Sequence, residues 1–330
     1  MKIWTKNTLP GLLLSLVLAG LAYSLGSLLP VVGGPVFGIL LGILVASLWQ
    51  LPTWLGGGVK FTSKYILQLA VILLGFDMNM ANIIRVGKES LVVLLVTLTT
   101  AFVIAHFVGN LLKVDTKLKT LIGVGTAICG GSAIAAASSA IDAEDQDISY
   151  AISTIFFFNV IAVFLFPAIG HLFNMSDTGF GMWAGTAIND TSSVVAAGFS
   201  YSNAAGNYAT IVKLTRSLMI VPITLVLAIL FSRKNKTQNH FNFIKVFPWF
   251  ILGFLLAAVI RSLSLLPLSA TGSLAWSGKF LIITAMAAIG LNTNIKAFIK
   301  AGPKALLLGA LTWMGVALSS LAVQFLARIL

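Results

Sequence analysis

The sequence predicts an all-α polytopic membrane protein with about eleven transmembrane helices, inverted repeats and two broken helices. The chain of 330 residues is 58% hydrophobic and only 9% charged, whereas a soluble domain carries about 25% charged residues. Its apolar stretches recur at the length that crosses a bilayer. Two similar stretches interrupt this pattern with glycine and polar residues, and a longer repeat surrounds them. These observations exclude a soluble fold.

Hydropathy places eleven apolar segments along the chain, so we expect residues 1–330 to form a single integral membrane domain. The first segment resembles a signal peptide, but its apolar run of about 20 residues is long enough to span, which favours an uncleaved helix. The segments are 10–30, 33–50, 64–79, 88–112, 118–141, 148–172, 178–200, 206–231, 245–266, 277–292 and 303–328.

The Lys and Arg residues predict the orientation of the chain in the membrane. A cytoplasmic N-terminus puts 14 of the 21 on the cytoplasmic side and leaves an acidic loop, residues 142–147, outside. Because the basic residues lie between apolar segments, the net charge of +12 does not indicate a nucleic-acid partner. The fourteen are Lys2, Lys6, Lys60, Lys64, Lys113, Lys117, Lys119, Arg233, Lys234, Lys236, Lys245, Lys296, Lys300 and Lys304.

A long internal repeat relates two blocks of three segments. A shift of 215 residues lays 33–112 on 248–327 without a gap. The two copies start on opposite sides of the membrane in the predicted topology, so the repeat is inverted, as in many secondary transporters. The shift pairs Gly38, Ser47, Leu48, Pro52, Lys64, Gly75, Asn79 and Gly87 with Gly253, Ser262, Leu263, Pro267, Lys279, Gly290, Asn294 and Gly302.

Two similar stretches lie in a central block, residues 118–231, between the repeats. Residues 125–138 read GTAICGGSAIAAAS, and 60 positions later residues 185–198 read GTAINDTSSVVAAG. Each is interpreted as two half-helices with an unwound centre, which a bilayer tolerates only beside protein or water. Paired breaks of this kind indicate a transporter's binding site. One full span separates them, so they run in the same direction unless one is re-entrant, and the sequence leaves this open.

Three charged residues lie within or near the breaks. Asp190 is costly at membrane depth and is therefore a functional candidate, although Asn189, Asp190 and Thr191 also suit the cap of a half-helix. Lys213 and Arg216 share one face of the eighth segment. Three interpretations stay open for them: they snorkel outward, they pair with Asp190, or they offer a basic face to an anionic substrate.

The remaining candidates are weaker. Asp77 closes the third segment, where a helix cap is favoured over a role in binding a proton or ion, and His106 is interpreted as a packing residue. The single cysteine, Cys129, excludes an internal disulfide and a cysteine-based zinc site. The motifs HExxH, GxSxG, GxGD and the P-loop are all missing. We therefore expect no enzyme activity, cofactor or metal.

The chain resembles the YeiH-type family of bacterial membrane proteins, named for sulfate export, in three motifs: GVGTAICGGSAIAAAS, GTAINDTSSVVAAG and VKLTRSLMIVP. The family is distantly similar to bile-acid symporters and sodium/proton antiporters. The resemblance implies scaffold and core domains, crossing broken helices, elevator-like alternating access, export across the inner membrane and a homodimer. It implies a substrate site at Thr126, Cys129, Gly130, Gly131, Ser132, Asn189, Asp190, Thr191, Ser192, Ser193, Lys213 and Arg216.

These features together favour a secondary transporter of a small anion: sulfate, an organosulfonate or a carboxylate. Two cations against one carboxylate leave a positive excess, to which half-helix N-termini add. Backbone N–H groups and Ser/Thr hydroxyls would hold the anion, and Lys213 or Arg216 would compensate its charge. Asp190 would bind a coupling proton or sodium, or orient a basic residue. The alternative is a cation/proton antiporter centred on Asp190. A structural or sensory membrane protein is the third possibility.

Overall fold

The computed structural model describes residues 8–29, 32–49, 51–235, 247–293 and 302–328, and all the regular structure within them is helical. Seven helical segments in these ranges are long and apolar enough to cross a membrane. They are Leu9–Leu28, Thr53–Asp77, Met80–Leu111, Asp145–Leu172, Asn203–Leu227, Leu268–Asn292 and Pro303–Leu326. The chain is therefore a helical membrane protein, as predicted.

The helices follow the predicted apolar segments in order. They are α1 (Leu9–Leu28), α2 (Gly34–Leu48), α3 (Thr53–Phe61), the π-helix η1 (Thr62–Ile66), α4 (Leu67–Leu74), the 3₁₀-helix η2 (Gly75–Asp77), α5 (Met80–Leu111), α6 (Thr116–Ala127), α7 (Gly131–Ile141), α8 (Asp145–Leu172), α9 (Asp177–Ala187), α10 (Thr191–Tyr201), α11 (Asn203–Ser217), α12 (Ile220–Asn235), α14 (Phe250–Ser262), α15 (Leu268–Asn292) and α17 (Pro303–Leu326).

Two helices begin earlier than hydropathy predicts. The third segment starts at Thr53 and the tenth at Leu268, because their first turns are rich in glycine and serine, which lowers the apolar signal. Lys64 and Lys279 were assigned to opposite membrane surfaces, but both lie in the middle of long helices. Of the basic residues that predicted the orientation, Lys2, Lys6, Lys236, Lys245, Lys296 and Lys300 lie outside the described residues.

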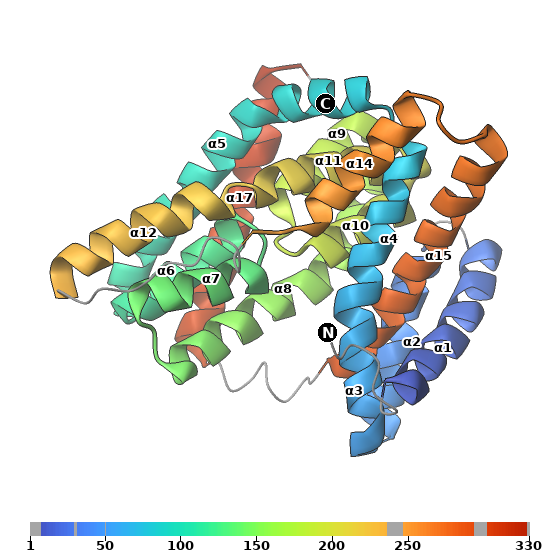
Figure 1. Ribbon diagram of the computed structural model, residues 1–330. Coiled ribbons are helices and arrows are strands. Elements are labelled where there is room, and N and C mark those ends of the chain that lie inside the picture. The colour runs from blue at the N-terminus through green and yellow to red at the C-terminus, as the bar shows by residue number, and fades with distance from the viewer. Residues whose placement is uncertain (1–7, 30–31, 50, 236–246, 294–301, 329–330) are drawn as a thin grey trace.

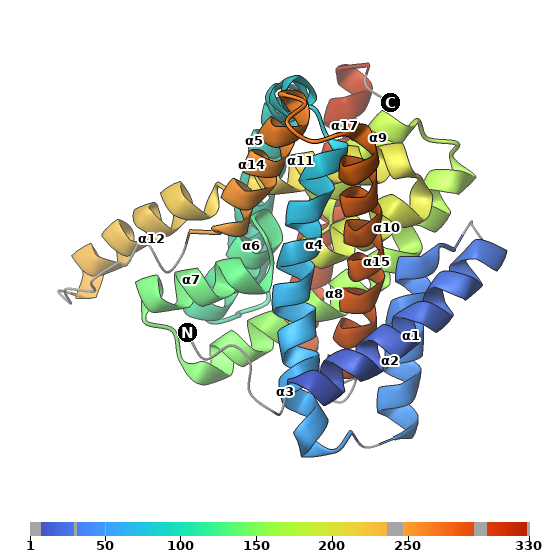
Figure 2. The same ribbon diagram turned by 45° about the vertical axis from the view of Figure 1, so that its right-hand side comes forward.

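The helices pack into two lobes, which Figures 1 and 2 show side by side. The repeat lobe consists of α1 to α4, α14 and α15, and the hairpin lobe consists of α5 to α12 and α17. The last helix of each sequence repeat, α5 or α17, packs with the hairpin lobe and not with the rest of its repeat. Helices α5 and α17 therefore lie against the central block, residues 118–231.

The repeat lobe packs as a two-fold repeat predicts. The shift of 215 residues maps the bounds Thr53–Asp77 onto Leu268–Asn292. Gly75 lies so close to the backbone oxygen of Phe254 that a Cβ would clash with it, and Gly290 lies equally close to the oxygen of Ile39. Under the same shift Gly75 becomes Gly290 and Ile39 becomes Phe254. Each repeat therefore places its long helix against the short helix of the other.

Adding a methyl group at either glycine is expected to destabilise the repeat lobe. The new Cβ of Gly75→Ala or Gly290→Ala would overlap backbone atoms, and overpacking of this kind costs about 1–3 kcal/mol. Gly272→Ala, in the same helix as Gly290 but facing open space, is the matched control. In detergent, both clashing variants should have unfolding temperatures well below that of the control. Equal unfolding temperatures for all three would contradict this packing.

Helices α6 and α7 form a helical hairpin, the first hairpin, residues 116–141. Lys117 at the start of α6 donates from Nζ to the backbone oxygen of Asp142, just after α7, at 2.6 Å. If the two half-helices ran on in one direction, these residues would lie about 37 Å apart at the α-helical rise. The two arms also touch, because a Cβ at Gly125 would meet the side chain of Ile134. The chain therefore enters and leaves this segment at the same end.

Helices α9 and α10 form the second hairpin, residues 177–201. The Ser202 hydroxyl donates to Asp177 Oδ1 at 2.5 Å, and the Tyr201 hydroxyl donates to the backbone oxygen of Met175. Helix α8 separates the two hairpin bases: it starts beside the first and ends beside the second, where His171 stacks on Tyr201. The hairpins therefore approach each other from opposite ends of α8.

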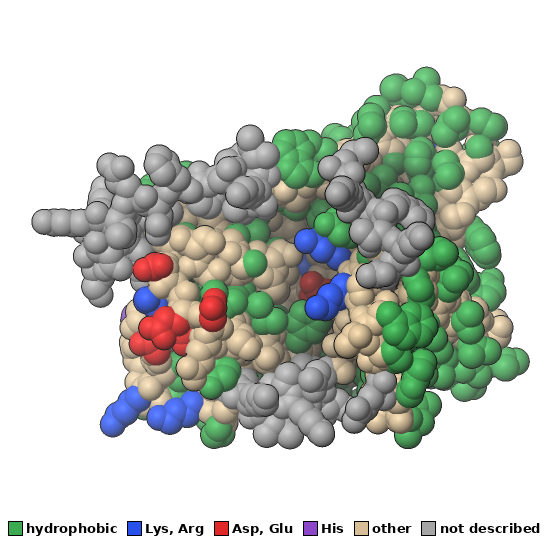
Figure 3. Space-filling model, turned by 60° about the horizontal axis from the view of Figure 1, so that its bottom comes forward, with side chains coloured by type: hydrophobic (Ala, Val, Ile, Leu, Met, Phe, Trp, Pro, Cys, Tyr) green, Lys and Arg blue, Asp and Glu red, His purple; other side chains and the backbone are tan. Residues whose placement is uncertain are grey.

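The fold-back bears on two expectations. The sequence left open whether one of the broken segments is re-entrant, and in the described chain each returns to the end where it began. The acidic loop at 142–147 was placed opposite the Lys113–Lys119 stretch, whereas Lys117 contacts Asp142 and lies within electrostatic reach of Asp147. Figure 3, which views the lower end of Figure 1, shows acidic and basic side chains together at one edge.

Candidate functional site

The tip of the first hairpin is an unwound turn that only glycine fits well. Helix α6 ends at Ala127, and Ile128 leaves the helical conformation with φ −119° and ψ −92°. Gly130 then takes φ +69°, a left-handed value that strains any residue with a Cβ. Helix α7 begins directly afterwards. Its N-cap residue, Gly130, has no side chain, and the Cys129 sulfur accepts a hydrogen bond from the backbone N–H of Ala133 in the first turn. The N–H groups of Gly131 and Ser132 are therefore left for another partner.

The tip of the second hairpin differs in its cap. Ile188 and Asp190 are extended, and the Asp190 carboxylate accepts hydrogen bonds from the backbone N–H and the hydroxyl of Ser192. Asp190 therefore caps α10, the structural role that the sequence suggested for it. Its side chain is half-buried and forms no ion pair among the described residues. The two tips are thus unequal, because α10 carries a fixed negative charge at its N-terminus and α7 carries none.

Lys213 and Arg216 of α11 join the two tips. The Lys213 ammonium donates to the backbone oxygens of Ile128 (2.7 Å), Ile188 (3.1 Å) and Asn189. The Arg216 guanidinium donates to the oxygens of Ala127 (2.7 Å), Ile188 (3.1 Å) and Thr126. These carbonyls end α6 and α9, where helices lack internal partners and carry partial negative charge.

This arrangement bears on the three open interpretations of the two cations. Both side chains are fully buried, at 0% and 1% exposure, so they do not snorkel outward. Neither forms an ion pair with Asp190 in the described structure, and their donors are directed at carbonyls and not at an open cavity. Their chemistry is that of a fixed cationic clamp, which satisfies the C-terminal ends of one helix from each hairpin.

Asn159 of α8 is a site residue that the sequence interpretation missed. Its Oδ1 accepts a hydrogen bond from the backbone N–H of Asp190 at 3.1 Å, while its Nδ2 has no partner. A Cβ at Gly130 would lie 3.7 Å from this Nδ2, so the unused donor faces the first tip. In the sequence, Asn159 is the one polar residue of the apolar run FFFNV. The position of this polar residue halfway along an apolar helix was the signal that could have identified it as a site residue.

Buried polar atoms without partners concentrate at the tips. Thr126 Oγ1, Asn159 Nδ2 and both side-chain polar atoms of Asn189 make no hydrogen bond, although all three residues are at most 2% exposed. Such atoms are rare in folded proteins and call for a bound ion, water or ligand. Ser132, by contrast, is exposed at the start of α7. The site therefore combines unused donors with access from outside.

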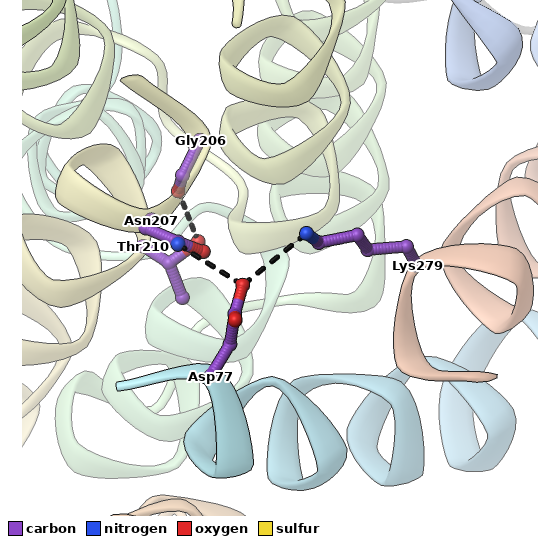
Figure 4. Close-up of polar contacts among 5 residues, drawn as sticks. All are labelled: Asp77, Gly206, Asn207, Thr210 and Lys279. Atoms are coloured by element: carbon purple, nitrogen blue, oxygen red, sulfur yellow. Dashed lines mark hydrogen bonds and ion pairs between the residues drawn. The ribbon is translucent and has the colours of Figure 1, made fainter. Parts of the chain in front are cut away.

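The other predicted site residues gather at the same place. Gly131 is half-buried, and the buried members are Thr126, Cys129, Gly130, Asn189, Thr191, Ser192 and Ser193. Asp77 does not belong to this group. It lies at the end of η2, where its Oδ2 meets Lys279 Nζ at 3.2 Å and accepts from Asn207 Nδ2 at 3.2 Å (Figure 4). His106 is exposed and within hydrogen-bond distance of Asn110, away from the tips.

A hollow opens between the lobes in the view of Figure 3, with basic side chains beside it and an acidic one deeper in. Among the described residues, no group of three His, Cys, Asp or Glu side chains is placed to hold a metal ion. The charged groups around the tips are instead two clamp cations and one carboxylate.

Comparisons with known proteins identify the family. Residues 10–309 match the family model described as Conserved hypothetical protein 698. The UPF0324 membrane protein SAG1125 of Streptococcus agalactiae is 45% identical over 97% of both chains. UPF0324 membrane proteins M6_Spy0799 of Streptococcus pyogenes and FN0533 of Fusobacterium nucleatum are 48% and 44% identical over at least 96% of each chain. No solved structure matches. The chain therefore belongs to the UPF0324 family of membrane proteins, in agreement with its YeiH-type motifs.

Proposed function

We propose that this chain is a secondary transporter of a small oxyanion: sulfate, an organosulfonate or a carboxylate. One observation carries the proposal. Two hairpins from opposite ends of α8 meet at a buried clamp and leave the first two N–H groups of α7 beside an unused Asn159 donor. Unwound backbone at membrane depth is a feature of transporter binding sites.

Charge at the tips supports an anion. Lys213 and Arg216 supply two positive charges and Asp190 one negative charge, so the formal sum is +1. The partial negative charges at the ends of α6 and α9 offset the partial positive charges at the starts of α7 and α10. A single negative charge would therefore neutralise the site. The clamp acts through its field and by fixing the tips, because its donors are already bonded to carbonyls.

The first two N–H groups of α7 support an oxyanion in particular. Backbone N–H groups at a helix N-terminus bind sulfate, phosphate and carboxylate oxygens without further help. Here they lie beside the Nδ2 of Asn159 and the exposed hydroxyl of Ser132. Gly130 lies next to the Asp190 and Asn159 side chains, which a Cβ there would meet at 3.6 and 3.7 Å. Asp190 keeps α10 capped and can hold a coupling proton or sodium.

The alternative is a cation/proton antiporter that uses Asp190. It is favoured by the half-buried carboxylate, which has no ion-pair partner in the described structure. Against it, the tip carbonyls that would suit a sodium ion are already occupied by Lys213 and Arg216. Asp190→Asn separates the two, because Asn also caps helices well. It should stop sodium-dependent proton movement in an antiporter and leave anion binding in place in an anion carrier.

We further propose an inner-membrane location with a cytoplasmic N-terminus, a homodimer, and elevator-like movement of the hairpin lobe against the repeat lobe in the direction of export. The positive-inside pattern supports the orientation, and the two lobes support the movement, since each is packed mainly within itself. The resemblance to the YeiH-type family supports the dimer and the direction.

The direct test is a stability screen of the purified full-length protein. Sulfate, methanesulfonate, acetate and succinate are compared with sodium chloride at equal ionic strength. A ligand at 100 times its Kd adds about 2.7 kcal/mol to the stability of the state that binds it. The proposal expects at least one oxyanion to raise the unfolding temperature and to exchange across proteoliposomes. Stabilisation by sodium alone would support the antiporter, and no response to any ion would reject both.

A further inference from the structure

Two lysines occupy equivalent places in the middle of the repeat lobe. Lys64 is the twelfth residue of the 25-residue segment Thr53–Asp77, and Lys279 is the twelfth of the 25-residue segment Leu268–Asn292. The shift of 215 residues maps one onto the other. Each is therefore about half a bilayer from either end of a helix long enough to span one.

Lys279 lies on the helix face turned toward the hairpin lobe. Seven residues after it lies Met286, fully buried in one cluster with Val163 of α8 and Val195 of α10. Residues seven apart on an α-helix share a face. Lys279 shows this directly, because its Nζ lies 5.7 Å from the centre of the Phe199 ring in α10.

The partners of the two lysines break the symmetry. Lys279 is neutralised by Asp77 at 3.2 Å. The repeat mate of Asp77 is Asn292, which donates to the hydroxyl of Ser63, beside Lys64, at 3.2 Å and brings no charge. Lys64 is exposed, and among the described residues no carboxylate pairs with it. Its Nζ lies 5.4 Å from the Tyr65 ring, an interaction that leaves the positive charge in place.

An uncompensated ammonium at this depth is costly in lipid, so its surroundings must be aqueous. The hollow in Figure 3 lies between the lobes and has basic side chains beside it. Lys64 also lies within η1, a π-helical turn, and such turns occur frequently at functional sites. The lysine that lacks an acid partner is thus held on an irregular turn, on the lobe opposite the hairpin tips.

We propose that Lys64 is a fixed cationic station for the oxyanion in an aqueous space between the lobes, from which the anion passes to the hairpin tips. The inference rests on the proposed function and adds a second anion contact on the other lobe. Lys279, already paired, serves as the structural member of the pair.

A charge-reporter experiment tests the station without knowledge of the substrate. In a Cys129→Ala background, Gln68→Cys places a thiol about one turn from Lys64. The reaction rates of anionic and cationic methanethiosulfonates are then compared. We expect Lys64→Gln to lower the anionic-to-cationic rate ratio by roughly three- to tenfold, and Lys88→Gln, an exposed lysine on α5, to leave it unchanged. A thiol unreactive to both reagents, or an unchanged ratio, would overturn the proposal.

Flux in proteoliposomes separates this inference from the function on which it rests. The probe is whichever of sulfate, methanesulfonate, acetate or succinate the wild type exchanges. Lys64→Gln should raise the half-saturation concentration at least fivefold, and Lys64→Arg should restore it. If the wild type transports a probe and Lys64→Gln has the same half-saturation concentration, the station is rejected and the proposed transport function stands. No wild-type flux with any probe rejects the proposed function, and the reporter experiment still decides whether Lys64 lies in an aqueous, positive hollow.

Discussion

Replacing Arg216 with Gln should unfold the protein at a much lower temperature and abolish any transport. The guanidinium donates to three carbonyls, from Thr126, Ala127 and Ile188, which belong to both hairpins. Removing one member of a buried charged network costs about 3–5 kcal/mol, because the remaining groups stay buried without partners. Native stabilities are only about 5–15 kcal/mol, so this loss is large.

The comparison that isolates the clamp is Arg85→Gln. Arg85 is 68% exposed in its side chain and pairs with Glu89 one turn away at 3.9 Å, an interaction of little value at the surface. Thermal unfolding in detergent should leave this control near wild type. Arg216→Lys should recover part of the stability, since it keeps the charge but loses the guanidinium fork. Equal unfolding temperatures for Arg216→Gln and Arg85→Gln would contradict the clamp role.

Changing Asn159 to Asp should remove anion binding while keeping the hydrogen bond that α8 accepts from the second tip. Aspartate keeps the acceptor that receives the Asp190 N–H at 3.1 Å, so the contact between α8 and the second tip survives. The substitution replaces the unused Nδ2 donor with an oxygen and adds a negative charge beside an anion site. We expect at least a tenfold loss of affinity, or about 1.4 kcal/mol, for whichever oxyanion the wild type binds.

The control for this prediction is Asn110→Asp in α5, an exposed asparagine within hydrogen-bond distance of His106. Binding is measured by the shift of unfolding temperature with anion concentration, which reports affinity separately from basal stability. Wild-type affinity in Asn159→Asp would show that the unused donor does not face the anion. An antiporter centred on Asp190 predicts a different outcome, because a second carboxylate would strengthen cation binding.

Most of the helices could be predicted from the sequence, because the residues that start and end a helix are close to it in the chain. Glycine and polar residues mark both breaks, and the 60-residue echo maps α7, Gly131–Ile141, onto α10, Thr191–Tyr201. The 215-residue repeat likewise places two long helices in register. In each case the residues that end a helix are next to it in the chain.

The direction of the chain after each break could not be predicted in the same way. Gly130 and Asp190 end one helix and start the next, but the return path depends on contacts between distant residues, such as Lys117 with Asp142 and Ser202 with Asp177. One clue was present in the lengths. Helices of 11 or 12 residues are about 17 Å long, which is roughly half the hydrocarbon thickness.

The partners of Lys213 and Arg216 were missed for a related reason. A sequence displays side chains, so the considered partners were a carboxylate, a substrate or water. The actual partners are backbone carbonyls 24 to 90 residues away, which become available only when both hairpins end at the same point. Asn159 was missed because its unused donor gains meaning only beside Gly130.

Disulfide trapping at the base of the second hairpin is the measurement that tests the hairpin arrangement most directly. In a Cys129→Ala background, Asp177→Cys with Ser202→Cys joins positions whose side chains now touch at 2.5 Å. We predict near-complete cross-linking of the purified protein, and none for Asp177→Cys with Asp142→Cys, which lie at the bases of different hairpins. Free thiols in the first pair would mean that α9 and α10 run on in one direction, and the tip-to-tip site would not exist.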